Sequence, residues 1–573
     1  KPSTESVWEL STEAAASWGE DRQIRADYLR HLLIDQQLTV HLIGARIDGD
    51  LNLSGDHTLT LSLPRCILTG AAQFDGATFA GDTRFIRATF TRAARFIGAR
   101  FTGDAGFDGA TFSGDTRFVG AKFTGDTRFV GAKFTEAAGF DGARFNGNTG
   151  FTRATFTGGA GFSGAKFTGD TRFDEATFTR AAGFDRTTFT AGAWFARATF
   201  TRGAGFAGAT FTSTAGFRGA TFTGGALFDE AKFTGAARFT ETRFTGPAEF
   251  TRARFTGNAE FTRVTFTGTT RFDEATLTAA AWFNESTFTG DAWFGRSRWR
   301  TLDWSRTVWQ SASVESAGLT AVSIVLDRAI FEHPVRLELT AGNISMERMQ
   351  ATERLHLVVA GARVNLEDAD LAEGSLIDAA PVQIPTTAVE AAAKDGQEQL
   401  VQASGISRWV FIPPYPKTDT MSEDTLRRET HSLMHALLFP DEDMHTTLDP
   451  EQHHRLSLMY ARLFLEADLS AALNHTPQAS VTSLRRAHVA GTTLSGMHLR
   501  ACTFTGADGL DELVIAGDDI LTNHRGDKDM MRAWPARGRK WWRTSRRVLH
   551  DELRLRDPHP ATTEVADTTT TTT

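Results

Sequence analysis

The chain has 573 residues, a formal net charge of −8 and two cysteines, Cys66 and Cys502. So few cysteines exclude a disulfide scaffold and make a reduced cytoplasm the default location. The sequence has no signal peptide and no apolar run of the ~18 residues that a membrane span needs, so we expect no membrane span. The chain begins at Lys1, and the sequence leaves open whether its true N-terminus is present.

The first segment, residues 1–37, shows helical periodicity through Ile24, Tyr28, Leu29 and Leu32. We predict a helix that caps the first coil of the repeat that follows, because an open β-edge invites aggregation.

Phenylalanine recurs from Phe74 to Trp299 at intervals that alternate between five and six residues. Of the 42 positions so defined, 40 are Phe, and the exceptions are Leu277 and Trp299. An eleven-residue coiled coil would need apolar residues three and four apart, so this spacing excludes it. The alternative is a β-solenoid in which each Phe marks an inward-pointing strand centre. The expected structural ladder includes Phe107, Phe112, Phe118, Phe123, Phe129 and Phe134.

Units such as AKFTG, ATFTG and ARFTG place a small residue two positions before a central Phe. They resemble the pentapeptide repeat, and the alternation of five and six resembles a Phe-rich bacterial subgroup of that family. The resemblance covers Leu42 to about Leu376 and again Leu484 to Leu510. It implies an all-β solenoid, a right-handed quadrilateral β-helix with four faces per coil. It does not imply a function.

The sequence itself also indicates a coil of 22 residues, since four alternating units add up to that length. In the series from Phe90 to Phe288 taken every 22 residues, eight of ten positions read Thr-Phe-Thr or Thr-Phe-Ser. In the interleaved series from Phe79 to Leu277, Lys or Arg precedes six of ten. Two surfaces of different chemistry therefore recur at this interval.

The solenoid is predicted to occupy residues 38–376. Pro-containing stretches such as APVQIPTT and two helical patterns predict a linker and α-helical insertion at 377–482. The repeat spacing returns at 483–515 as a second short block, which could dock on the first. Residues 516–556 are predicted to form a basic helical tail, and 557–573 a disordered Thr-rich tail.

Function has to be argued from surfaces, because a fold alone does not specify it. We expect a non-catalytic protein-interaction scaffold that needs no cofactor. The alternative is a DNA mimic that modulates a type II topoisomerase (gyrase), as the best-understood proteins resembling this repeat do. Residues 71–300 carry 28 Lys and Arg against 21 Asp and Glu, and a DNA mimic should have the opposite sign.

A minor alternative is nucleic-acid binding through residues 525–556, where basic and Trp side chains interleave and could meet phosphates and bases. The candidate anionic-partner surface comprises Arg532, Arg537, Arg539, Lys540, Trp541, Trp542, Arg543, Arg546 and Arg547. The simpler interpretation, which we favour, is an amphipathic helix that caps the second block.

Other chemistry is not favoured. His431 and His435 are four residues apart and could share one helix face, with His445, His453, His454, Glu429 and Asp443 nearby, but no HExxH pattern is present and no metal site is predicted. The Thr-Phe-Thr face could form an ice-binding array, but Lys133 and Arg243 interrupt it. We expect Cys66 and Cys502 to be small solenoid residues, and no phosphate loop or CxxC motif supports an enzyme.

Overall fold

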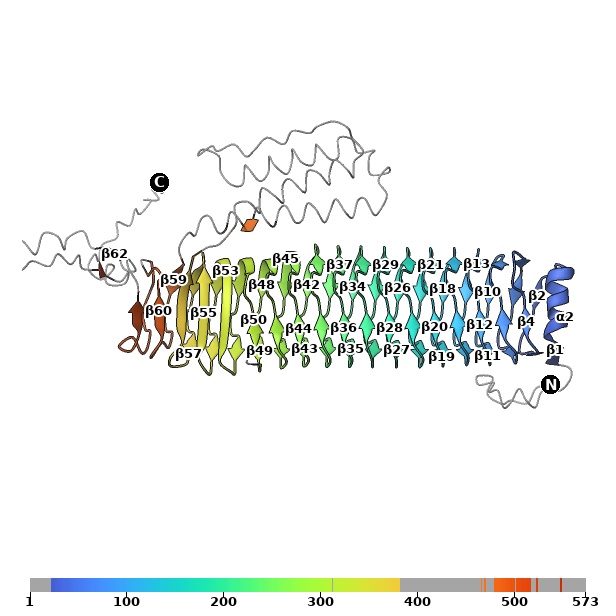
Figure 1. Ribbon diagram of the computed structural model, residues 1–573, viewed down its shortest axis with the longest axis horizontal. Coiled ribbons are helices and arrows are strands. Elements are labelled where there is room, and N and C mark those ends of the chain that lie inside the picture. Colours follow the sequence, from blue (N-terminus) through green and yellow to red (C-terminus); the bar gives the residue numbers. More distant parts are fainter. Residues whose placement is uncertain are drawn as a thin grey trace, which may run out of the picture. The chain divides into compact units, whose positions relative to one another are not determined.

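The computed structural model describes residues 22–311, 313–381, 479–499 and 501–516, isolated positions between 465 and 472, and the strand pairs 522–523 and 547–548. Figure 1 shows short strands that stack in chain order along one axis. All strand pairs between coils are parallel, and they form sheets of 17, 31 and 13 strands. The predicted β-solenoid is therefore confirmed.

One coil consists of four short strands, one on each face. In the coil that begins the Phe repeat they are β8 (Ala72–Gln73), β9 (Thr78–Phe79), β10 (Thr83–Arg84) and β11 (Thr89–Phe90). We call their faces 1, 2, 3 and 4 in that order. Each strand pairs with the strand 22 residues later, as in Phe79↔Phe101 and Phe90↔Phe112. The four faces that the resemblance implies and the 22-residue coil that the residues flanking Phe indicate are both correct.

The same four-strand pattern continues to β44 (Thr270–Arg271), after which faces 2 and 3 join. Longer strands there run through the corner between the two faces, and for this reason both faces belong to the 31-stranded sheet. The longer strands are β45 (Thr276–Trp282), β48 (Arg298–Asp303), β51 (Leu319–Val325), β53 (Val335–Ser345), β55 (Leu355–Ala360) and β58 (Leu376–Ala380). Face 1 is the 13-stranded sheet and face 4 the 17-stranded sheet.

Coil length follows the size of the core side chains. In the Phe region paired residues are 22 apart, as in Phe112↔Phe134. Where the core changes to smaller aliphatic residues, the residues that pair between successive coils are 20 positions apart, as in Leu337↔Leu357 and Leu357↔Ile377. A close-packed interior leaves no voids, so smaller core residues require a shorter perimeter.

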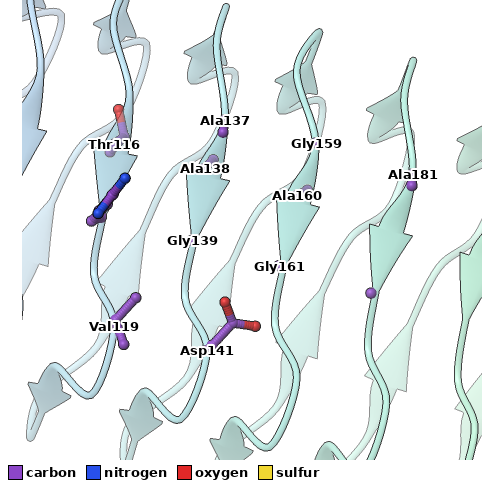
Figure 2. Close-up of a pocket in the computed structure, with 12 residues that line it drawn as sticks. Thr116, Val119, Ala137, Ala138, Gly139, Asp141, Gly159, Ala160, Gly161 and Ala181 are labelled. Carbon is purple, nitrogen blue, oxygen red and sulfur yellow. The ribbon is translucent and has the colours of Figure 1, made fainter.

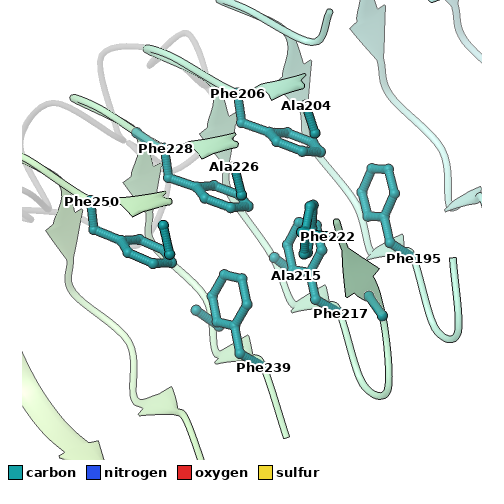
Figure 3. Close-up of a cluster of buried hydrophobic side chains, with 14 of the residues drawn as sticks. Phe195, Ala204, Phe206, Ala215, Phe217, Phe222, Ala226, Phe228, Phe239 and Phe250 are labelled. Carbon is teal, nitrogen blue, oxygen red and sulfur yellow. The ribbon is translucent and has the colours of Figure 1, made fainter. Parts of the chain in front are cut away.

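The interior of the Phe region is a zigzag of stacked and edge-on rings (Figure 3). Within one face, rings of successive coils stack almost in parallel. The ring centroids of Phe195 and Phe217, for example, are 4.8 Å apart, and the angle between the ring planes is 3°. Between faces 1 and 3, rings meet edge to face, as in Phe206–Phe217 at 5.6 Å and 90°. Both arrangements are favourable for aromatic pairs. Small inward residues such as Ala204 and Ala226, fully buried, fill the space beside the rings.

A strand and a helix close the N-terminal end. β1 (Gln23–Arg25) pairs with β3 (Arg46–Asp48), and α2 (Ala26–Arg30) follows and continues as the π-helical turn η2 (His31–Asp35). Ala26, Leu29 and Leu33 are buried, a spacing that fits one helix face. The expected cap is present, and within the described residues its helix begins at Ala26, after β1. Ile24 lies in β1, where it pairs with Ile47. Tyr28 is 54% exposed because the buried face of the helix is formed by Ala26, Leu29 and Leu33.

The second repeat block continues the same solenoid. β59 (Ser480–Ser483) pairs with β56 (Arg363–Asn365), and β60 (Thr493–Ser495) pairs with β58 before β61 (Val514–Ala516) follows. The described solenoid therefore includes residues at both ends of the predicted 377–482 insertion. The interior of this insertion lies almost wholly outside the described residues. The predicted tails after residue 516 also lie outside them, apart from β62 (Thr522–Asn523) and β63 (Arg547–Val548).

Two charged contacts join the strands on either side of the insertion. Arg486 Nε donates to Asp368 Oδ1 at 2.6 Å, and Arg485 pairs with Glu367. The Arg486 guanidinium lowers the pKa of Asp368 to about 2.

No helix in the described part of the chain is long and apolar enough to span a membrane.

Replacing one stacked ring should open a cavity that cannot collapse. Phe217 is fully buried between rings of its own and neighbouring faces. We expect Phe217→Ala to lower the free energy of unfolding by about 3–5 kcal/mol. Urea denaturation followed by circular dichroism measures it, with Leu227→Ala as control because Leu227 is 38% exposed. A loss below about 1 kcal/mol, the typical effect of a point mutation, would show that the ladder tolerates cavities.

Two glycines in different corners should respond differently to a methyl group. A Cβ on Gly158 would lie 2.3 Å from the backbone of Glu136 in the preceding coil, whereas one on Gly120 meets nothing within 4 Å. Gly120 has φ +66°, yet Arg186 holds a similar φ in the same column of a later coil. We therefore expect Gly158→Ala to reduce the urea midpoint more than Gly120→Ala. Equal midpoints would contradict the steric argument.

The contact across the insertion should depend on pH. Because the folded-state pKa of Asp368 is lowered, its stabilising effect is complete above the unfolded pKa of about 3.8 and disappears as the pH falls towards about 2. The difference in urea midpoint between the native chain and Asp368→Asn should thus be full at neutral pH and shrink over that interval. Asp115→Asn is the control, since Asp115 lies 3.9 Å from its Arg117 partner. A pH-independent difference would disprove the electrostatic origin.

Candidate functional site

An aspartate column runs along the corner between faces 2 and 3. Its members, one per coil, are Asp82, Asp104, Asp126, Asn148 and Asp170. Each side-chain oxygen accepts the backbone N–H of the corresponding residue in the next coil, at distances such as 2.9 Å from Asn148 N to Asp126 Oδ1. The corner interrupts the strand ladder, and buried or half-buried N–H groups need an acceptor. We therefore assign this column a structural role.

Charged residues also occupy the left-handed turn positions at the other corners. Glu175 and Arg197 have φ of 59° and 54°, and Arg197 Nη2 donates to Glu175 Oε1 at 2.5 Å. This hydrogen bond lowers the pKa of Glu175 and raises that of Arg197. Further pairs between adjacent coils are Glu230–Arg252, Glu241–Arg263, Glu274–Arg296 and Glu285–Arg306. These exposed pairs contribute little stability, but they neutralise the corners.

A cation column on face 2 follows the opposite pattern. It consists of Arg100, Lys122, Arg144 and Lys166, which are direct neighbours in register on consecutive strands. All four side chains are exposed. Within the described part of the chain, none of the four has an ion pair within 4.0 Å. Like charges directly opposite on neighbouring strands are destabilising.

The cation column is bordered by uncharged columns. On one side are Gly98, Gly120, Gly142 and Gly164, all left-handed, where an added Cβ would meet nothing within 4 Å. On the other side are Thr102, Thr124, Asn146 and Thr168. The nearest column of carboxylates on this face, the aspartate column, lies beyond these residues and is hydrogen-bonded to backbone. The column therefore presents a strip of unneutralised positive charge.

A shallow depression of about 520 Å³ lies on face 1, in the same coils as the cation column. Figure 2 shows its floor, where two adjacent strands, β20 (Ala138–Gly139) and β24 (Ala160–Gly161), carry no side chain at Gly139 and Gly161. Arg117 and Asp141 are the charged residues that line it. Arg117 and Lys122 are separated only by the turn that contains Gly120, so the depression and the cation column lie on either side of one edge.

The surface predicted from the basic tail lies outside the described residues. This applies to Arg532, Arg537, Arg539, Lys540, Trp541, Trp542, Arg543 and Arg546, and for Arg547 only the backbone is described, in β63. The histidine cluster around His431 and His435 is also outside them. Within the described ranges, no three His, Cys, Asp or Glu side chains are placed to hold a metal ion.

The residues expected in the interior lie there. Phe107, Phe112, Phe118, Phe123, Phe129 and Phe134 are at most 1% exposed. Cys66 and Cys502 are fully buried, and burial raises the pKa of the Cys66 thiol to about 11, which disfavours a reactive thiolate. The sequence showed that Lys or Arg often precedes Phe on face 2. Which cations lack a counter-charge depends on side-chain positions, which no sequence pattern indicates.

Comparison with known proteins agrees with this architecture. The family model described as pentapeptide repeats (9 copies) matches residues 63–111, 107–155, 151–199, 162–210, 184–232, 206–254, 228–276 and 250–298. Neither the curated proteins nor the solved structures contain a match. The matched ranges together cover the Phe region from residue 63 to residue 298. Residues 63–298 of the solenoid therefore consist of pentapeptide repeats.

Proposed function

We propose that this protein is a non-catalytic scaffold that binds a protein partner along the outside of its solenoid. The observation that carries the proposal is the column arrangement of exposed residues. Parallel stacking repeats the same chemistry at a fixed interval over many coils, as in the cation column and in the threonines of face 4, for example Thr177↔Thr199. Solenoids of this kind use such extended surfaces for binding.

The interior supports the same proposal. It is filled by aromatic and aliphatic side chains, with Phe rings in contact from Phe74 to Phe294. Ligand sites are normally concave and lined by apolar groups with a few placed polar ones. The depression on face 1 is shallow and is lined mainly by Gly and Ala. A surface that recognises an extended partner fits this molecule better than a pocket that encloses a small molecule.

A DNA mimic that binds a topoisomerase is the second candidate. The aspartate column is the feature that favours it, because four of its five members are acidic. Arg84 lies 3.4 Å from Asp82 in this column, and residues 71–300 carry 28 Lys and Arg against 21 Asp and Glu. A mimic of duplex DNA requires a continuous negative surface. Addition of the protein to a gyrase supercoiling reaction tests this candidate, and strong inhibition or protection would favour it over the scaffold.

Face-specific crosslinking tests the scaffold proposal. A photoreactive amino acid is placed on one face at a time, at Leu227, Thr124, Arg238 or Thr201, which represent faces 1, 2, 3 and 4. We expect one protein to be captured in cells from one face or from two adjacent faces, and the purified partner to bind the native chain. Capture from all faces without preference, or from none, would contradict a dedicated binding surface.

A further inference from the structure

The cation column is the longest run of neighbouring like charges, without a counter-charge, on the solenoid between Phe74 and Trp299. In other charged columns, carboxylates either alternate with arginines, as in Glu241 and Arg263, or accept backbone N–H groups, as in Asp126. Four adjacent cations repel one another and make no compensating contact in the described structure. An anionic partner on this strip would remove the repulsion, and complementary charge also selects and orients partners.

The spacing of the column limits the kind of anion. Parallel strands lie about 4.8 Å apart, so four consecutive cations span roughly 14 Å. An α-helix rises 1.5 Å per residue, so carboxylates at positions i, i+3, i+7 and i+10 span about 15 Å on one side. In an extended segment four alternate residues span roughly 20 Å. A DNA duplex carries one charge per about 1.7 Å, which is much denser than the column. The helix matches best.

The surroundings leave room for such a helix. The left-handed glycines beside the column have no heavy atom near the position of an added Cβ, so this lane is open backbone. Across the same edge, the depression on face 1 continues the open surface past Gly139 and Gly161 (Figure 2). Asp141 is the acidic residue in this depression, and its Oδ1 is occupied by the backbone N–H of Ser163 at 2.8 Å.

We propose that the cation column Arg100, Lys122, Arg144 and Lys166 binds the acidic face of an α-helix from a partner protein, with the helix body over the adjoining glycine lane. This inference rests on the proposed scaffold function and specifies one surface and one class of partner. Each carboxylate of the helix lies opposite one cation, and the helix axis is parallel to the solenoid axis.

The test uses the full-length chain and two helical peptides of the same composition. One peptide has four glutamates at i, i+3, i+7 and i+10, and the other spaces them five residues apart, which distributes them around the helix. Fluorescence anisotropy at low salt measures binding. We expect the first peptide to bind more tightly. Arg100→Gln, Lys122→Gln, Arg144→Gln and Lys166→Gln together should weaken it about tenfold, as four exposed ion pairs would.

The matched control neutralises four exposed cations elsewhere, namely Arg92→Gln, Lys133→Gln, Arg180→Gln and Arg202→Gln. The control variant and the column variant have the same net charge. Both keep residues 525–556 intact, so any binding of the peptides by this basic segment is the same in the two variants. The column variant should also have an unfolding midpoint in urea at least as high as that of the native chain, because the like charges are gone. As a rescue, a column of four glutamates should bind a helix with lysines at the same positions.

Three outcomes would overturn the proposal. Equal binding of the two peptides, or equal weakening by the column and control variants, would indicate long-range attraction without a site. Stronger binding of a single-stranded oligothymidine, lost only in the column variant, would identify a nucleic acid as the ligand. Crosslinking of a partner from faces 3 or 4 alone would refute this surface and leave the scaffold function standing. Absence of crosslinks from every face would instead refute the scaffold function itself.

Discussion

The structure depends on parallel stacking of nearly identical coils. Strand register places each residue directly above the residue 22 positions earlier, at a separation of about 4.8 Å. A residue type that repeats in one column must therefore tolerate itself as its closest neighbour. Phenylalanine meets this condition, because stacked rings pack well and bury apolar area at the same time. The sequence repeats Phe for this reason, and the rest of the coil adjusts to it.

The same condition makes charge difficult to repeat. The chain compensates repeated charge in two ways. At the left-handed corners Glu and Arg alternate, as in Glu285 and Arg306, and at the corner between faces 2 and 3 the Asp side chains satisfy backbone N–H groups. The cation column uses neither solution. Since neutral Thr occupies the equivalent position at Thr188 and Thr210, the fold does not require cations there.

The Phe spacing predicts the buried ladder, and the residues that flank Phe, which recur every 22 positions, indicate the coil length. The four faces are what the resemblance to the repeat implies. Features that depend on contacts between distant segments were not predictable. The pairing of Val364 with Val481 joins strands on opposite sides of the insertion, and no local pattern indicates it. The apolar spacing at Ile24 predicts a helix, whereas its pairing with Ile47 places it in a strand. For the candidate site, the sequence identified cations on face 2 but not their lack of partners.

The position of the cation column follows from the energetics of a stacked solenoid. In such a fold the stability of each coil depends mainly on its own contacts and those with its two neighbours. The coils that contain Arg100 to Lys166 have an unbroken Phe interior, with rings such as Phe123–Phe145 and Phe145–Phe167 both 4.7 Å apart. Stacked Phe rings therefore lie directly beneath the charges that repel one another. The aromatic ladder can offset a local cost there that the aliphatic coils after Phe331, with less apolar area to bury, would offset less well.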